Sequence, residues 1–297
     1  MIHKLGTLAV LALAAPAAEA GPIPSSSPAA SATVIQMKPW RTRWAIEAEI
    51  GGKKGLFLFD SGAGLTLVSK NTLARSGCQL WGRTTGYTMM GIRGQGPHCE
   101  GVPLTIGGIR LEPPMLGPIE MGEANPRDAE LDGVIGLNLF EGRTLTIDFA
   151  AGTLTLETDA SRSARVAAMR PLPIRLKREV DGRALAVVTA VPTTKGALWM
   201  ELDSGNGGTV LVSKPVAELV GMSPTLEGKQ RADFAVIDDV RATTDDAFTP
   251  DMIMDGNLGM PFLRNWVVTL DLDHARAWIG RSPKAPVVET TTAAAAH

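Results

Sequence analysis

The chain has 297 residues, of which 44% are hydrophobic and 20% are charged, and its formal net charge is -2. This length suits two lobes that each bury a core of their own. So small a net charge leaves neither a basic patch nor an acidic tail, and we therefore expect no nucleic-acid partner.

The first residues have the pattern of an export signal. Lys4 precedes the apolar run of residues 5–15, and Ala18-Glu19-Ala20 is a small-x-small cleavage pattern. We predict a signal peptide over residues 1–20, and hence an exported, periplasmic or secreted protein without stable membrane insertion after cleavage. The run is short for a membrane span, and an uncleaved anchor is the alternative.

Strand signals dominate the rest of the chain. Short β-branched or aromatic runs alternate with turns that contain Gly or Pro, which indicates an all-β protein. These runs lie at residues 44–50, 55–60, 144–149, 152–157, 184–191, 197–203 and 266–272. Short helices are expected at residues 69–76, 138–141 and 214–220. A leader over residues 21–32 and a tail over residues 285–297 have compositions typical of disordered segments.

An internal repeat organises the sequence. The motif "FDSGA" at residues 59–63 returns as "LDSGN" at residues 202–206, each time after a predicted hairpin. The segment of residues 132–156 also aligns without a gap on residues 255–279. We therefore predict two homologous lobes, and the predicted boundaries are 33–158 for the N-terminal lobe, 159–170 for a linker and 171–284 for the C-terminal lobe.

Each copy of the repeat ends an apolar strand in an aspartate, Asp60 or Asp203. A buried carboxylate is costly unless it is hydrogen-bonded or shared. If the lobes face each other about a pseudo-two-fold axis, the two aspartates meet, and carboxylates about 3 Å apart hold one proton between them. Such a pair is one acid and one base, able to polarise a peptide carbonyl and to activate a water.

The residues after each aspartate fit this geometry. Gly62 and Gly205 permit a sharp turn and a close approach of substrate backbone. Ser61 and Ser204 carry hydroxyls that could hydrogen-bond across the interface between the lobes and lock the two loops together.

These motifs resemble those of the two-lobed aspartic peptidases of the pepsin and retropepsin superfamily. In that family an apolar strand leads to Asp-Thr/Ser-Gly, and an apolar-apolar-Gly segment closes each lobe. Here "FDSGA" is followed by "VIG" at residues 134–136, and "LDSGN" by "NLG" at residues 257–259. The resemblance implies the pepsin-like fold with two homologous lobes related by a pseudo-two-fold axis, a few short helices, a catalytic dyad of Asp60 and Asp203 around an attacking water, and no cofactor.

The resemblance also implies a flap over the cleft. Residues 84–96 have Gly-rich turn chemistry and lie in the first lobe, which has the longer middle segment. Tyr87, Gly91 and Gly94 are the substrate-binding candidates in this flap. The alternative for Tyr87 is packing at the base of the flap.

Three residues depart from the family pattern. Asn206 stands where Ser, Thr or Ala is usual, and it could hydrogen-bond Asp203 and tune it. Strand alternation places Glu201 on the same face as Asp203. We expect Glu201 to point to a solvated edge; the alternative is a third carboxylate that shifts the titration of the pair upward. Asn257 replaces an apolar residue, which we expect to matter little.

Cys78 and Cys99 are the only cysteines. In an oxidising compartment they could form a disulfide, although two unpaired buried thiols fit the spacing equally well. His98, His274 and His297 have no spacing typical of metal ligands, so we predict no metal site.

Together these features predict an aspartic endopeptidase that hydrolyses internal peptide bonds of exported proteins or peptides with an Asp-Asp dyad and an activated water. Because both aspartates lie in one chain, we expect a monomer. The rival hypothesis is a catalytically impaired peptide-binding envelope protein on the same fold, disabled through Glu201 or Asn206. A protease with one dedicated exported substrate would share the enzyme's chemistry.

Overall fold

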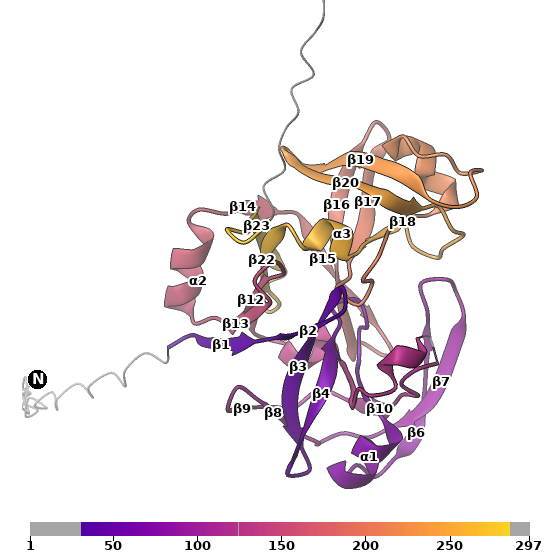
Figure 1. Cartoon of the computed structure of the whole chain (residues 1–297). Coiled ribbons are helices and arrows are strands. Elements are labelled where there is room, and N and C mark those ends of the chain that lie inside the picture. The colour runs from indigo at the N-terminus through magenta and orange to yellow at the C-terminus, as the bar shows by residue number, and fades with distance from the viewer. Residues whose placement is uncertain (1–30, 124, 286–297) are drawn as a thin grey trace, which may run out of the picture. The chain divides into compact units, whose positions relative to one another are not determined.

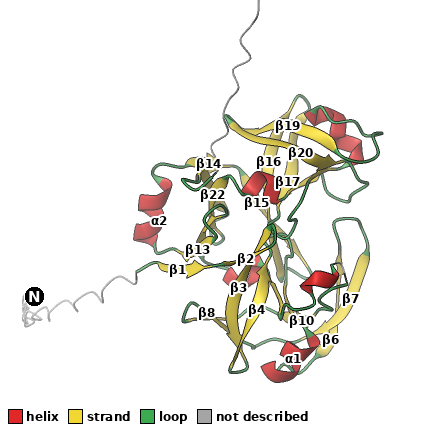
Figure 2. Ribbon diagram, in the orientation of Figure 1, coloured by secondary structure: helices red, strands yellow, loops and turns green. Residues whose placement is uncertain are grey.

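The computed structural model describes residues 31–123 and 125–285. The predicted signal peptide, all but the last two residues of the predicted leader, and the predicted tail beyond residue 285 lie outside these residues. Strands are the predominant secondary structure of the described chain, and its helices are short (Figure 2). Within this part of the chain, none of the helices is long and apolar enough to cross a membrane.

Residues of the first repeat form an eight-stranded sheet (Figure 1). Its strands are β2 (Lys38–Trp40), β3 (Arg43–Ile50), β4 (Lys53–Phe59), β5 (Thr66–Val68), β8 (Leu104–Ile106), β9 (Ile109–Leu111), β10 (Leu116–Pro118) and β11 (Gly133–Ile135). In β3 buried and exposed side chains alternate, whereas Phe57, Leu58 and Phe59 of β4 are all buried. Because β4 is covered on both faces, it reads as a continuous apolar run. Strand β11 runs parallel to β4 and antiparallel to β5.

Residues of the second repeat form a seven-stranded sheet. Its strands are β15 (Ile174–Glu179), β16 (Ala184–Thr193), β17 (Gly196–Leu202), β18 (Val210–Val212), β19 (Gln230–Ile237), β20 (Val240–Phe248) and β21 (Gly256–Leu258). Strand β21 runs parallel to β17 and antiparallel to β18. Strand β11 lies in the same way between β4 and β5. The two repeats of the sequence therefore have the same pairing of these three strands.

A third, six-stranded sheet takes strands from both repeats. Its strands are, in order across the sheet, β1 (Thr33–Gln36), β13 (Thr153–Leu156), β12 (Thr144–Asp148), β22 (Trp266–Asp271), β23 (Arg276–Arg281) and β14 (Arg170–Leu172). Strands β12 and β22 pair antiparallel with Thr146 opposite Thr269, and the two hydroxyl oxygens are 2.8 Å apart. Local sequence patterns did not predict this shared sheet.

The helices expected from the sequence are present within about a residue of their predicted bounds. They are α1 (Lys70–Ser76), η2 (Leu137–Phe140) and η3 (Lys214–Val220). The described chain also contains η1 (Pro126–Asp128), α2 (Asp159–Val166) and α3 (Met260–Leu263).

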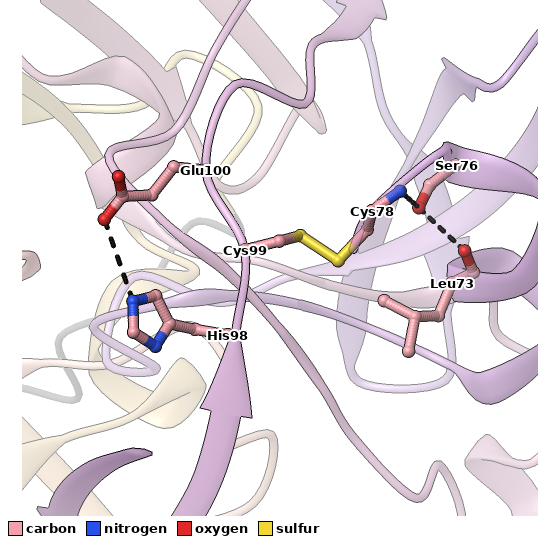
Figure 3. The surroundings of a disulfide bond; sticks show 6 residues. All are labelled: Leu73, Ser76, Cys78, His98, Cys99 and Glu100. Carbon is pink, nitrogen blue, oxygen red and sulfur yellow. Dashed lines mark hydrogen bonds and ion pairs between the residues drawn. A yellow bond between two sulfur atoms is a disulfide. The ribbon is translucent and has the colours of Figure 1, made fainter. Parts of the chain in front are cut away.

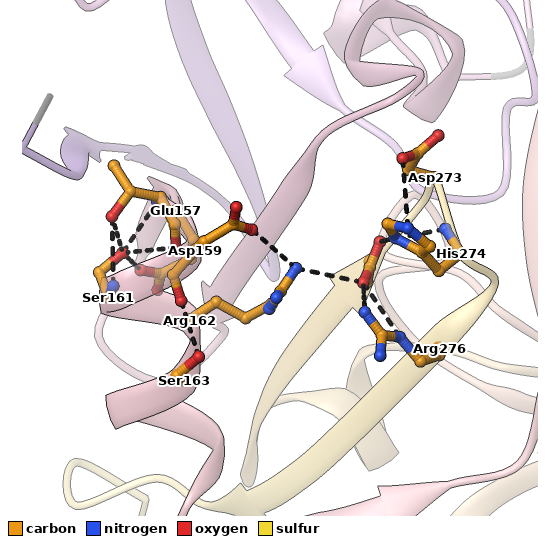
Figure 4. A network of polar contacts seen from close by, with 10 residues as sticks. Glu157, Asp159, Ser161, Arg162, Ser163, Asp273, His274 and Arg276 are labelled. Carbon is orange, nitrogen blue, oxygen red and sulfur yellow. Dashed lines mark hydrogen bonds and ion pairs between the residues drawn. The ribbon is translucent and has the colours of Figure 1, made fainter. Parts of the chain in front are cut away.

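Helix α2 occupies most of the segment that the sequence predicted as a linker. Thr158 and Ser161 form a capping box at its start, and none of its residues is buried. Arg162 reaches from this helix to Asp271 at the end of β22, with 3.5 Å between Nη1 and Oδ2 (Figure 4). Burial opposes ionisation of Asp271, but hydrogen bonds with Arg276 and His274 outweigh it and lower the pKa of Asp271. The polar helix is thus held by an ion pair.

A disulfide joins Cys78 to Cys99, with 5.7 Å between the Cα atoms (Figure 3). It ties the chain just after α1 to the end of a hairpin made of β6 (Trp81–Tyr87) and β7 (Arg93–His98). Of the two possibilities that the sequence left open for these cysteines, the structure contains the disulfide.

Candidate active site

Each aspartate of the repeated motif follows the last residue of a central strand. Asp60 follows β4, and its backbone N–H donates to the Ile135 carbonyl of β11 at 3.0 Å. Asp203 follows β17, and its N–H donates to the Leu258 carbonyl of β21 at 3.1 Å. The two carboxyl groups therefore leave equivalent points of the two sheets.

Two serines bind the aspartate loops to each other. The Ser61 N–H donates to Ser204 Oγ at 3.0 Å, and the Ser204 N–H donates to Ser61 Oγ at 3.0 Å. Each hydroxyl in turn donates to a carbonyl of the opposite strand: Ser61 to Leu202 at 2.7 Å, and Ser204 to Phe59 at 3.0 Å. These are the hydrogen bonds expected of the two serines, and because both are buried the loops are held in one register.

Asp60 and Asp203 line the same cavity, and the carboxyl group of each packs against the glycine of the other motif. A Cβ at Gly62 would lie 2.6 Å from Asp203 Cγ, and a Cβ at Gly205 would overlap the Asp60 carboxyl, so both positions require glycine. Burial, followed by the charge and the hydrogen bond of Asp203, raises the pKa of Asp60 well above its ordinary value. Asp60 therefore retains its proton at a pH where a lone aspartate would be ionised.

The two carboxyl groups receive different numbers of hydrogen bonds. Asp60 Oδ1 accepts one from the Gly62 N–H at 2.9 Å. Asp203 Oδ1 accepts from the N–H groups of Gly205 at 2.8 Å and Asn206 at 3.1 Å. Asp203 Oδ2 accepts a further hydrogen bond from Asn257 Nδ2 at 2.6 Å.

Asn206 acts on Asp203 differently from the sequence prediction. Its backbone donates to Asp203, but its side-chain Nδ2 donates to Asn257 Oδ1 at 2.8 Å. Asn257, which the sequence analysis expected to matter little, is the residue whose side chain reaches Asp203. The signal that could have found it was an amide in a closing segment whose counterpart, Val134, is apolar.

The prediction that Glu201 points to a solvated edge is wrong. Its side chain is buried, with 3% of the residue exposed, and it lines the same cavity as Asp203. Strand β17 lies between β16 and β21, so Glu201 has a strand on either side and no open edge beside it. Burial, and then the charge of Asp203, raises the pKa of Glu201 to about 8.

Lys177 is a member of this site that the sequence analysis did not single out. Its Nζ lies 3.8 Å from Glu201 Oε1 and 3.0 Å from Glu179 Oε1. Lys177 comes from β15, which pairs with β16 rather than with β17. Only the order of strands in the sheet brings it near Glu201, and no local pattern carried that information.

The aspartate pair lies at a cavity of about 500 Å³. Its walls come from both repeats and include Leu65, Met115, Lys177, Ala184 and Met254. Apolar side chains thus surround a small number of charged groups, as is usual for binding sites for small molecules and peptides.

The hairpin β6–β7 forms a two-stranded sheet of its own (Figure 1), and several of its residues line this cavity. Tyr87 and Gly94 line the cavity, and Tyr87 remains 56% exposed. Gly91 lies instead in the turn, with a φ of 77°, and is not among the cavity-lining residues. Of the three flap candidates, two therefore face the cavity.

Both ends of this hairpin contact the second repeat. At its tip, the Met89 carbonyl accepts a hydrogen bond from the Ile253 N–H at 3.1 Å. At its base, Arg183 Nη1 lies 2.8 Å from His98 Nε2 and 2.8 Å from Glu100 Oε1. The hairpin therefore bridges the two repeats, with the cavity beneath it.

In the part of the chain that the structure describes, no three His, Cys, Asp or Glu side chains are grouped so that they could hold a metal ion. No family model and no curated protein matches the sequence. The fold is similar to the crystal structure of basic 7S globulin from soybean, with a TM-score of 0.57 and 9% sequence identity, over 85% of this chain and 95% of that chain. At this identity the likeness shows the fold alone. The chain is a predominantly β protein, and its structural neighbour is a protein of pepsin-like fold.

Proposed function

We propose that the protein is an aspartic endopeptidase in which Asp60 and Asp203 form the catalytic dyad. The observation that carries this proposal is that Asp60 and Asp203 line one cavity, each carboxyl group packed against the glycine of the other motif, beside a hairpin that bridges both repeats. A carboxyl pair that holds one proton supplies a general acid and a general base at the same place.

The proposal includes two lobes related by a pseudo-two-fold axis. The serine hydrogen bonds are reciprocal, and their two members are 143 positions apart in the chain. Thr146 and Thr269, which are equivalent in the aligned closing segments, lie opposite each other in the antiparallel pair β12–β22. Reciprocal contacts between equivalent residues are what a two-fold relation produces.

In the proposed reaction, a water between the two carboxyl groups attacks the carbonyl carbon of a peptide bond. The ionised carboxyl takes one proton from the water, and the protonated carboxyl gives its proton to the carbonyl oxygen, so that a neutral diol forms. The diol collapses when the C–N bond breaks. The nitrogen then receives the proton taken from the water, and one diol hydroxyl returns a proton to the dyad. The products are an acid and an amine, and no covalent enzyme intermediate forms.

The substrate we propose is an extended segment of a polypeptide. Hairpin residues Gly94 and Gly96 line the cavity and leave backbone groups of the flap within reach of a bound chain. Backbone hydrogen bonds of this kind bind peptides with modest dependence on sequence. Both dyad residues belong to one chain, which supports a monomer, and the disulfide between Cys78 and Cys99 supports export to an oxidising compartment.

Incubation of the purified protein with a diverse peptide mixture from pH 3 to 9 tests the proposal, with new termini mapped by mass spectrometry. The matched controls are Asp60→Asn and Asp203→Asn, which keep the size of the side chain and remove the shared proton chemistry. We expect cleavage by the unaltered protein and a loss of at least about 10³-fold in both variants. Cleavage that survives in either variant contradicts the dyad.

The rival function, peptide binding without hydrolysis, is favoured by a third carboxyl group, Glu201, which is buried at the same cavity and contributes by its charge to the raised pKa of Asp60. The same peptide mixture distinguishes the two functions. Peptides that the unaltered protein retains on a column without new termini would support the binding protein and would exclude the endopeptidase.

A further inference from the structure

A chain of hydrogen bonds runs from a backbone amide of the second repeat to Asp203. The Thr209 N–H donates to Asn206 Oδ1 at 3.2 Å, and Asn206 Nδ2 donates to Asn257 Oδ1 at 2.8 Å. Asn257 Nδ2 then donates to Asp203 Oδ2 at 2.6 Å. Asn257 is fully buried, with an exposed fraction of 0%, so water does not compete for these bonds.

The direction of this chain is fixed at its start. A backbone N–H can only donate, so Asn206 must turn its oxygen towards Thr209. The Thr209 carbonyl accepts from Asn206 Nδ2 at 3.1 Å, which holds the same orientation of the amide. Asn206 Nδ2 therefore donates to Asn257, and Asn257 must accept this hydrogen bond with its Oδ1. Its Nδ2 is left to face Asp203, so the acceptor at the end of the chain is the Asp203 carboxylate.

The two aspartates consequently differ in what surrounds their oxygens. Both oxygens of Asp203 accept hydrogen bonds from groups that cannot reverse, whereas Asp60 accepts one backbone hydrogen bond, at Oδ1. Donors directed at a carboxyl group favour its charged form. We infer that Asn257, oriented by Asn206, is a positioning residue that makes Asp203 the ionised member of the pair and leaves the shared proton on Asp60.

The charged groups around Asp203 are compatible with this assignment. Glu201 lines the same cavity as Asp203, and burial, followed by the charge of Asp203, raises the pKa of Glu201 to about 8, so that Glu201 is largely neutral well below that pH. Lys177 Nζ lies 3.8 Å from Glu201 Oε1 and is also paired with Glu179. At pH 6, the pH of the test below, Glu201 therefore adds little negative charge that would oppose ionisation of Asp203.

The catalytic meaning of the inference rests on the proposed function: Asp203 would take the proton from water, and Asp60 would donate to the substrate carbonyl. The location of the proton can be tested by a stability measurement, which does not require the protein to cleave a peptide. In Asp60→Asn, the new amide can accept from the Gly62 N–H and donate to Asp203, as a protonated Asp60 would. In Asp203→Asn, the new oxygen is held by the N–H groups of Gly205 and Asn206, so the new NH₂ faces the NH₂ of Asn257.

The test compares the melting temperatures of these two variants of the full chain at pH 6. We expect Asp203→Asn to melt about 5 °C below Asp60→Asn, because two donors then face each other in a buried place. In the background Asn257→Val, which gives position 257 the residue found at 134, we expect the difference to fall to about 1 °C. Equal melting temperatures, a lower value for Asp60→Asn, or an unchanged difference in the Asn257→Val background would overturn the inference.

If Asp203→Asn does not fold, carboxyl-carbon NMR of the unaltered chain makes the same distinction. We expect the Asp60 carboxyl to keep its proton well above the pH at which a free aspartate ionises, and an Asp60 carboxyl that is already ionised at pH 6 would overturn the inference. Failure of the proposed function has a different signature. A protein that cleaves nothing but shows the melting difference retains the proton assignment, whereas cleavage with equal melting temperatures retains the endopeptidase and removes the assignment.

Discussion

The residues packed around Asp60 and around Asp203 differ although the two backbones match. Next to Asp60, Leu58 of β4 pairs with Val134 of β11, and both belong to a small apolar cluster. At the matching place next to Asp203, Glu201 of β17 pairs with Asn257 of β21. A repeated strand arrangement therefore carries an apolar pair in one half of the molecule and a polar pair in the other.

We propose that this difference gives two identical side chains different chemistry. In an apolar setting a carboxyl group keeps its proton, because the charged form is poorly solvated. In a setting with fixed donors the charged form is favoured. The matching strand arrangement brings the two carboxyl groups together. The residues paired on the two neighbouring strands, Leu58 with Val134 and Glu201 with Asn257, then make the surroundings of the two carboxyl groups different.

The largest effect that we expect from breaking this comparison is on stability. The folded protein holds the Glu201 proton up to about pH 8, whereas the unfolded chain releases it near 4.5, so the free energy of unfolding falls as pH rises between these values. This loss amounts to about 4 kcal/mol at pH 8. Glu201→Gln should remove it, which chemical unfolding at pH 4.5 and pH 8 would measure.

The matched change in the other half is Leu58→Gln. There the amide enters the apolar cluster without a partner, so we expect a loss of about 3 kcal/mol at both pH values. A steep pH dependence that persists in Glu201→Gln, or a stable Leu58→Gln protein, would mean that the two settings do not differ as described.

The disulfide bears on a second difference between the two halves, which concerns how a hairpin is attached in each. The hairpin β6–β7 forms a two-stranded sheet of its own, whereas the hairpin β19–β20 is joined to β18 within the seven-stranded sheet. The Cys78–Cys99 bond closes a loop with a sequence separation of 21, and the chain-entropy relation gives it about 3 kcal/mol. Denaturant unfolding with and without reductant should show this loss. The stability of the double variant Cys78→Ala/Cys99→Ala should not depend on reductant. A loss of stability in reductant for this variant would mean that the effect does not come from the Cys78–Cys99 disulfide.

A smaller effect is expected on kcat when the polar residue Asn257 beside Asp203 is replaced by an apolar one. Asn257→Val removes the hydrogen bond to Asp203 Oδ2, and we expect kcat to fall about 20-fold with KM little changed, because the lost donor acts on the dyad rather than on substrate binding. Steady-state kinetics on a cleaved peptide would measure both constants. Val134→Ile is the control, because it changes the apolar cluster without touching a donor; a comparable fall in kcat there would point to packing instead.

The smallest expected effect concerns the hairpin tip. Ile253→Pro removes the N–H that binds the Met89 carbonyl, while Ile253→Ala keeps it. Loss of one such hydrogen bond is worth about 1 kcal/mol, so hydrogen exchange of the amides in residues 84–96 should become about fivefold faster in the proline variant only. Equal exchange in both variants would show that this hydrogen bond does not hold the hairpin closed.

Much of the fold could be predicted from the sequence because its signals are local or repeated. The strand "LFLFD" reads as a buried central strand, and Gly77 ends α1 in the left-handed conformation that glycine favours. The repeat of Asp-Ser-Gly places two aspartates at equivalent strand ends. Helix α2 was interpreted as a linker because it buries no residue and so has no apolar stripe to reveal it.

The polar setting of Asp203 could not be predicted because it depends on neighbours far apart in the chain. Strand alternation placed Glu201 and Asp203 on one face, but the pattern is the same for an edge strand and for a central one. Only the pairing of β17 with β16 and β21 buries Glu201, and only the position of β15 brings Lys177 near it. The orientation of Asn257 depends on Asn206, which lies 51 positions away.

The dependence of kcat/KM on pH, measured with a cleaved peptide from pH 3 to 9, is the most direct test of a dyad that works with one shared proton. We predict a bell: the rate constant falls at low pH, where both carboxyl groups are protonated, and falls again at high pH, where both are ionised. Burial and the neighbouring Asp203 raise the pKa of Asp60, so the alkaline limb should lie well above the pH at which a free aspartate ionises. A rate constant that rises to a plateau and stays there through pH 9 would contradict the shared proton and with it the proposed dyad.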